Sequence, residues 1–112
     1  MGKQLELFKS EVTFDDLIEN VKGWAEDKNI LKNENVPNQL MTVMEELGET
    51  AGAIAKNKVT DEIQDGIGDT FVTLIILSYQ LGLEPTQCLE RAWNEIKGRT
   101  GKTVNGVFIK NE

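Results

Sequence analysis

Histidine does not occur anywhere in the 112 residues, and Cys88 is the single cysteine. A Ser-His-Asp triad, a Cys-His dyad and zinc sites with histidine ligands are therefore excluded. The Glu-x-x-His pattern of di-iron bundles is excluded for the same reason. One cysteine cannot form an internal disulfide, which fits a reducing compartment. Any metal must then be held mainly by oxygen, which favours Mg²⁺, with Mn²⁺ as a second candidate.

Long apolar runs and basic residues are also scarce. The longest apolar stretch, residues 71–77, is interrupted by Thr73 and is too short to cross a bilayer. The N-terminal segment MGKQLELFKS lacks the apolar core of a signal peptide. There are 12 basic and 19 acidic residues, which gives a net charge of −7. We therefore expect a cytoplasmic protein that binds neither membranes nor nucleic acid.

The length predicts one domain over residues 1–112, and the apolar periodicity predicts an all-α subunit resembling a four-helix bundle. The helices are expected from Thr13 to the polar segment KNILKNEN, from Pro37 to about Lys56, from Thr60 to Leu81, and from Pro85 to about Lys97. Asn105-Gly106 between short β-branched and aromatic runs predicts a small C-terminal β-hairpin.

The helix ends have recognisable signals. Thr13 with Asp16 forms a capping-box pattern, Thr60 is a second candidate cap, and Gly82 is a stop signal. The second half of the third helix, FVTLIILSYQL, is apolar on nearly every side, which predicts burial against another subunit. We therefore expect a homodimer or homotetramer. On the fourth helix, the apolar residues are expected to face inward: Leu89, Ala92, Trp93 and Ile96.

Two acidic clusters lie on the two central helices. Each places its carboxylates at i,i+3 and i,i+4 spacing, on one helix face, where like charges repel. The members are Glu45, Glu46 and Glu49 on the second helix and Glu62, Asp65 and Asp69 on the third. Acidic residues on a helix are usually a solvated face. If the two clusters face each other, a divalent cation would reverse the repulsion, and the array has the oxygen donors that Mg²⁺ requires.

The pair of motifs EELGE and DEIQDGIGDTFVTLIIL resembles the MazG-like nucleoside triphosphate pyrophosphohydrolases of the all-α NTP pyrophosphatase superfamily. The resemblance covers roughly residues 14–110. Its ending, AWNEIKGRTGKTVNGVFIKNE, is similar to the tail of short stand-alone members that are often carried by phages. The resemblance implies Mg²⁺-dependent cleavage of a nucleoside triphosphate between the α and β phosphates. The products are a nucleoside monophosphate and pyrophosphate, and the implied role is house-cleaning of the nucleotide pool.

The family pattern is Glu-Glu-x-x-Glu followed by Glu-x-x-Asp on the next helix. The resemblance implies that Glu46 and Glu49 are metal ligands and that Asp69 is the aspartate of the second motif. In this register, Gly66 stands where the family has a glutamate. Asp65 or Glu62 must then supply the missing oxygen. Glu45, or whichever carboxylate binds no metal, would accept a proton from the attacking water.

Basic residues that follow the fourth helix are candidates for binding the phosphates: Lys97, Arg99 and Lys102. Lys97 and Arg99 equally suit the negative end of a helix dipole. Trp24 is a candidate for stacking on a base, although it also fits an apolar core stripe, and Cys88 fits a small buried hydrophobe. The alternative to an enzyme is a catalytically silent helical oligomer that binds nucleotide or a protein partner, and Gly66 is the residue that favours it.

Overall fold

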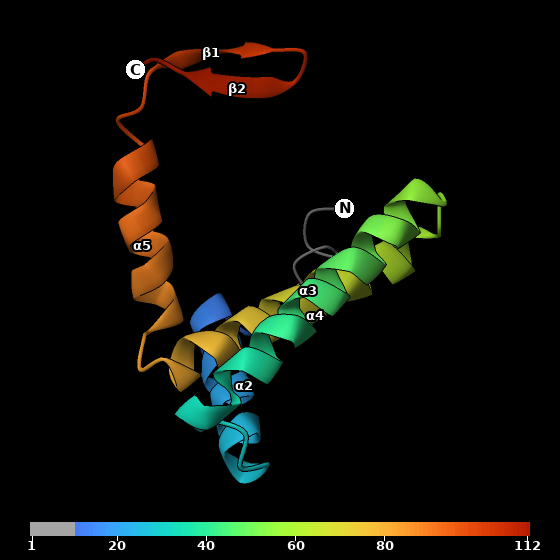
Figure 1. Ribbon diagram of the computed structural model, residues 1–112, viewed down its shortest axis with the longest axis vertical. Helices are drawn as coiled ribbons and strands as arrows, with labels where there is room; N and C mark the ends of the chain where they lie inside the picture. The colour runs from blue at the N-terminus through green and yellow to red at the C-terminus, as the bar shows by residue number, and fades with distance from the viewer. Residues whose placement is uncertain (1–10) are drawn as a thin grey trace.

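The computed structural model describes residues 11–112, which form four α-helices, a 3₁₀ turn and one β-hairpin (Figure 1). The segment MGKQLELFKS lies outside the described residues. In chain order, the elements are α2 (Phe14–Asp27), η1 (Asn33–Asn35), α3 (Val36–Ala55), α4 (Thr60–Gln80), α5 (Pro85–Ile96), β1 (Gly101–Val104) and β2 (Val107–Lys110). The prediction of a mainly helical chain with a C-terminal hairpin is confirmed.

Local capping chemistry explains most of the element boundaries. At the start of α2, Asp16 N–H donates to Thr13 Oγ1 at 3.1 Å and Thr13 N–H donates to Asp16 Oδ2 at 3.2 Å, which confirms the capping box. Helix α4 ends at the predicted stop, where Gly82 has φ 73°. The prediction for Thr60 is wrong, because Val59 is the N-cap and no side chain caps this helix. Thr60 is the first helical residue instead.

Helices α3 and α4 form an antiparallel pair that is the centre of the fold (Figure 1). Near one end, Gln39 Nε2 donates to the Thr73 carbonyl at 3.0 Å, in a buried hydrogen bond. Near the other end, Thr50 packs directly on Gly66. The two contacts fix the register of the pair. This register brings the acidic second half of α3 alongside the acidic first half of α4.

A small core lies where α2 crosses this pair. Its buried apolar residues are Ile18, Ala25, Val43, Ile75 and Ile76. Phe14 of α2 meets Phe71 of α4 edge to face, with ring centroids 5.8 Å apart. Within the described residues, no large side chain is less than 2% exposed. One chain therefore builds only a shallow core.

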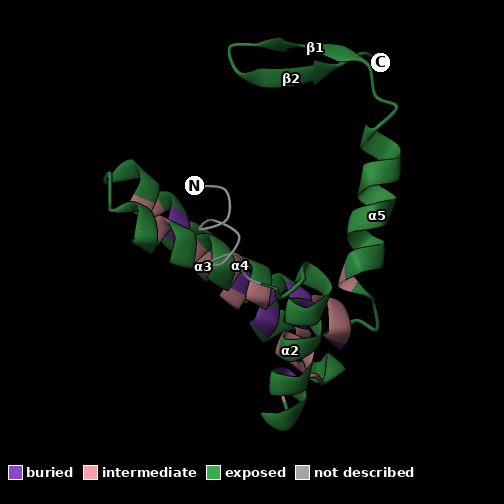
Figure 2. Cartoon of the chain, turned by 180° about the vertical axis from the view of Figure 1, so that it is seen from behind, coloured by how far each residue is buried: buried purple, intermediate pink, exposed green. Residues whose placement is uncertain are grey.

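The last 28 residues form an arm that projects from the other helices (Figures 1 and 2). We call residues 85–112, which comprise α5 and the hairpin, the C-terminal arm. No residue of α5 or of the two strands is buried. The prediction of inward-facing residues on α5 is therefore wrong within one chain, since Leu89 is 64% and Trp93 is 56% exposed. Cys88 is exposed rather than buried.

The direction of the arm explains these corrections. Helices α4 and α5 meet at 102°. Helix α5 therefore turns away from the α3–α4 pair, and Leu89, Trp93 and Ile96 of its apolar stripe stay about half exposed or more. Trp24 on α2 is 51% exposed, so core packing does not account for it within one chain.

The hairpin forms at the predicted turn. Asn105 and Gly106 have φ values of 52° and 78°, the two positive values that a two-residue type I′ turn requires. The strands pair antiparallel with Lys102 opposite Ile109 and Val104 opposite Val107.

In residues 11–112, no single helix is long and apolar enough to span a bilayer. Helices α4 and α5 reach the required length and composition only when they are taken together across their bend.

Candidate metal site

The two acidic clusters meet at one polar pocket between α3 and α4. The pocket has a volume of about 250 Å³. Five carboxylates line it, three of them from α4: Glu46, Glu49, Glu62, Asp65 and Asp69. The antiparallel register of the helices produces this convergence, because the second half of α3 lies beside the first half of α4. Sequence spacing predicted the faces, and the structure shows that they border the same cavity.

Negative charge is concentrated at this pocket. Partial burial of Glu46 raises the pKa of its carboxyl above the ordinary value of 4.5, and the charges of Glu49, Asp69 and Glu45 raise it further, in that order. Within residues 11–112, no lysine or arginine forms an ion pair with any of the five carboxylates. The ionised site therefore lacks local compensation, and a bound cation would supply it.

The carboxylates are gathered but not preassembled around an ion. In the described part of the chain, no three acidic or cysteine side chains are placed to hold one metal together. The donor set nevertheless suits a hard cation, because every side chain that could bind one here offers oxygen. Joint coordination therefore requires rotation of these side chains, four of which are exposed and one, Glu46, partly buried.

Thr50 is a pocket residue that the motif analysis missed. It is buried, lines the acidic pocket and donates from Oγ1 to the Glu46 carbonyl at 2.8 Å. Its position directly after the EELGE motif, four residues from Glu46, was the available signal. This hydrogen bond within α3 fixes the Thr50 side chain where it lines the pocket and packs on Gly66.

The contact between Thr50 and Gly66 gives a structural reason for a glycine at position 66. A side chain at Gly66 would collide with Thr50 Oγ1, so only glycine allows α3 and α4 to approach this closely. A glutamate at position 66 would force the helices apart or displace Thr50. Asp65 and Glu62 line the same pocket and are both placed to offer the oxygen that Gly66 lacks.

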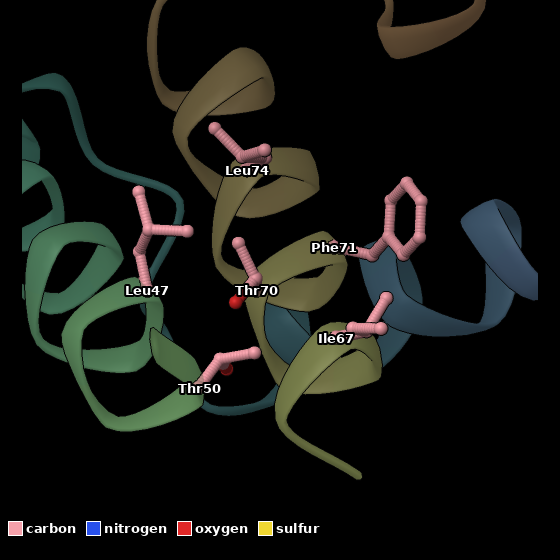
Figure 3. Close-up of a pocket in the computed structure, with 6 residues that line it drawn as sticks. All are labelled: Leu47, Thr50, Ile67, Thr70, Phe71 and Leu74. Atoms are coloured by element: carbon pink, nitrogen blue, oxygen red, sulfur yellow. The ribbon is translucent and has the colours of Figure 1, made fainter. Parts of the chain in front are cut away.

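A second, apolar pocket of about 180 Å³ lies between α3 and α4 (Figure 3). Thr50 lines both pockets, so the two share a wall. The other residues around the apolar pocket are Leu47, Ile67, Thr70, Phe71 and Leu74. The α3–α4 pair therefore presents an acidic surface directly beside an apolar one.

The candidate substrate-binding residues do not line the acidic pocket. Lys97, Arg99 and Lys102 belong to the C-terminal arm, which stands apart from that region of α3 and α4 (Figure 1). Arg99 pairs with Glu95 at 3.2 Å on the arm itself. Trp24 lies on α2, and Glu45 affects Glu46 electrostatically without lining the pocket.

Comparisons with known proteins give one partial match. The chain is similar to an uncharacterized 18.2 kDa protein in the rep-hol intergenic region of Haemophilus phage HP1, with 45% identity over 64 residues. The aligned segment is 57% of this chain and 39% of the phage protein. No protein-family model and no solved structure matches the chain.

Proposed function

We propose that the protein is a Mg²⁺-dependent nucleoside triphosphate pyrophosphohydrolase of the MazG-like type. The observation that carries the proposal is the convergence of five carboxylates from two helices on one pocket. The carboxylates come from the EELGE motif on α3 and from the acidic motif on α4, which is the order in which the MazG-like family has its two motifs. The partial match to a phage protein is compatible with a phage-type member, although that protein is itself described as uncharacterized.

In this proposal, most of the acidic residues would bind the metal ion and one would accept a proton. Glu46, Glu49 and Asp69, with Asp65 or Glu62, would hold Mg²⁺, or Mn²⁺ in its place. When bound, such an ion would neutralise triphosphate charge and lower the pKa of a coordinated water. Glu45 lies beside the ligand set and would accept the proton that the water loses. Thr50 would hold the Glu46 backbone in place through its hydrogen bond.

The same proposal includes a homodimer or homotetramer in the cytoplasm. The apolar residues that one chain leaves about half exposed, such as Leu47, Phe71 and Trp93, need a partner surface. Burial against a second chain would complete the helical bundle that a single chain leaves open.

The test is product analysis with a panel of canonical and modified triphosphates. We expect Mg²⁺-dependent formation of nucleoside monophosphate and pyrophosphate in equal amounts. Glu49→Gln should lower turnover at least about a hundredfold, because it removes a charged ligand. Asp61→Asn is the matched control, since it removes an acid from α4 that does not line the pocket. Equal activity in Glu49→Gln and the wild type would refute the assignment.

A silent nucleotide-binding oligomer is the competing function. Two observations favour it: Gly66 replaces a motif glutamate, and no three acids are preassembled. Calorimetry with Mg²⁺ and a non-hydrolysable triphosphate separates the two functions. Binding without any product formation from the hydrolysable substrates would establish the silent oligomer.

A further inference from the structure

The C-terminal arm carries its basic and apolar side chains on shared faces. In the hairpin, residues that lie opposite each other point to the same side of the two strands. The pairing therefore places Lys102, Val104, Val107 and Ile109 on one face. Val104, Val107 and Ile109 are 41%, 63% and 53% exposed. We call these four residues the docking face. A surface that covers the three apolar residues of the docking face would therefore also contact the Lys102 ammonium group.

An isolated two-stranded hairpin is marginal in water. Because no strand residue is buried, the hairpin lacks support from the rest of residues 11–112. Helix α5 has the same deficit, with Leu89, Trp93 and Ile96 between 49% and 64% exposed. Residues 11–112 therefore leave the apolar side chains of the arm available to a partner surface.

The amount of unburied surface indicates how large the partner must be. The chain exposes 9176 Å². A compact folded protein of this mass exposes only about 6,200 Å². The excess is roughly 3,000 Å² for one chain, so a dimer that removed it from both chains would bury about 6,000 Å² in total, at the upper end of the range for obligate interfaces. The radius of gyration is 17.3 Å, whereas a compact chain of this length has about 13 Å.

The distribution of charged residues indicates which surface the arm would contact. Helices α3 and α4 carry seven acidic and no basic residues: Glu45, Glu46, Glu49, Asp61, Glu62, Asp65 and Asp69. The C-terminal arm carries five basic residues and three acidic ones, with Lys97 and Lys102 among the basic ones. The α3–α4 pair offers an apolar pocket beside an acidic one, and the docking face offers three apolar residues beside a lysine. The two surfaces are complementary in both respects.

We propose that the C-terminal arm of one chain packs on the α3–α4 pair of a second copy and places Lys102 at the rim of that copy's acidic pocket. Each site would then be composite, with carboxylates from one chain and an ammonium group from the other. This inference rests on the proposed function for the task of Lys102, which is to bind substrate phosphate. The docking itself stands on the apolar surfaces and the charges alone.

Docking is tested first without any activity measurement. Val107→Asp puts a charge on the docking face, and we expect dimers to become monomers in light scattering coupled to size exclusion. Thr103→Asp is the matched control, because Thr103 lies on the opposite face of the same hairpin. Circular dichroism should show unchanged helix content in both variants. A dimeric Val107→Asp protein, or equal dissociation in both variants, would overturn the proposal.

The composite site is tested by complementation. Lys102→Gln alone should lower kcat/KM about tenfold, since a charge-assisted contact to phosphate is lost. Glu49→Gln and Lys102→Gln chains with different tags are then produced together, and doubly tagged dimers are purified. Such dimers hold one intact pocket that receives one intact arm. They should show about half of the wild-type activity, as expected for one complete site of two.

If each arm serves its own chain, these mixed dimers will show no more than half of the Lys102→Gln activity. That result would overturn the composite site, as would failure to obtain any doubly tagged species. The two proposals fail separately. A wild-type dimer that dissociates on Val107→Asp but hydrolyses no triphosphate would retain the docking and remove the enzymatic function. An active wild type whose Val107→Asp variant stays dimeric would do the reverse.

Discussion

At the scale of single residues, Glu46 has a carboxyl pKa that is raised by partial burial and by the neighbouring charges of Glu49, Asp69 and Glu45. Its folded-state pKa is raised, so the folded protein holds this proton more tightly than the unfolded chain does. The stabilisation from this group is complete below the unfolded value of about 4.5 and is lost as pH rises through the raised folded value. At neutral pH, the ionised Glu46 therefore opposes folding of the metal-free chain.

Removing that charge should stabilise the protein. We expect Glu46→Gln to have a higher Tm than the wild type at pH 7 in the presence of chelator, and no advantage at pH 4. Glu26→Gln, an exposed acid on α2, is the control and should change little at either pH. Thermal scans at both pH values provide the measurement. A lower Tm for Glu46→Gln at pH 7 would show that the repulsion is already compensated.

Gly66 and Gly68 provide a second test at the residue scale. A methyl group at Gly66 meets Thr50 Oγ1, whereas one at Gly68 meets nothing within 4 Å. Gly66→Ala should destabilise the protein by about 1–2 kcal/mol, because overpacking outweighs the gain in helix propensity. Gly68→Ala should stabilise it by about 0.5–1 kcal/mol. Urea unfolding of both variants measures these changes in unfolding free energy. Similar stabilisation by both substitutions would show that the Thr50–Gly66 contact does not require glycine.

At the scale of helices and strands, boundaries follow from short-range chemistry and were predictable. The capping box at Thr13, the stop at Gly82 and the Asn105-Gly106 turn each depend on a few neighbouring residues. The acidic faces were predictable for the same reason. The Thr50–Gly66 contact was not, because it joins residues 16 positions apart and depends on the register of two helices. The 102° angle between α4 and α5 could not be predicted from the sequence of neighbouring residues either.

Thr13 and Thr60 lie near the starts of α2 and α4, and their substitution by alanine compares a helix start that has a side-chain cap with one that has none. Thr13 makes a side-chain capping bond to Asp16 N–H, and no side chain caps α4, where Thr60 is the first helical residue. Thr13→Ala should therefore cost about 1 kcal/mol of unfolding free energy. Thr60→Ala should cost close to nothing. Urea unfolding at one fixed protein concentration measures both. Equal losses would mean that the capping bond at α2 contributes no net stability.

At the scale of the whole molecule, the acidic pocket and the exposed apolar surfaces both lack a complementary surface within residues 11–112 of one chain. The α3–α4 pair carries seven acidic residues, and the C-terminal arm, with five basic residues and three acidic ones, stands away from their pocket. A single chain thus leaves both its charge and its apolar area uncompensated. A second chain would resolve both at once, which links the stability of the fold to the completeness of the site.

This link predicts that stability depends on protein concentration. If unfolding accompanies dissociation of a dimer, a tenfold increase in concentration adds about 1.4 kcal/mol to the apparent stability. With a urea m-value of about 1–3 kcal/mol/M, the midpoint should rise by about 0.5–1.4 M for each tenfold step. Val107→Asp should remove most of this dependence, because its dimer is already dissociated, and Thr103→Asp should retain it. A wild-type midpoint that stays constant over a hundredfold range of concentration would show that one chain is stable with its apolar stripes exposed, and the dimer would then have no role in folding.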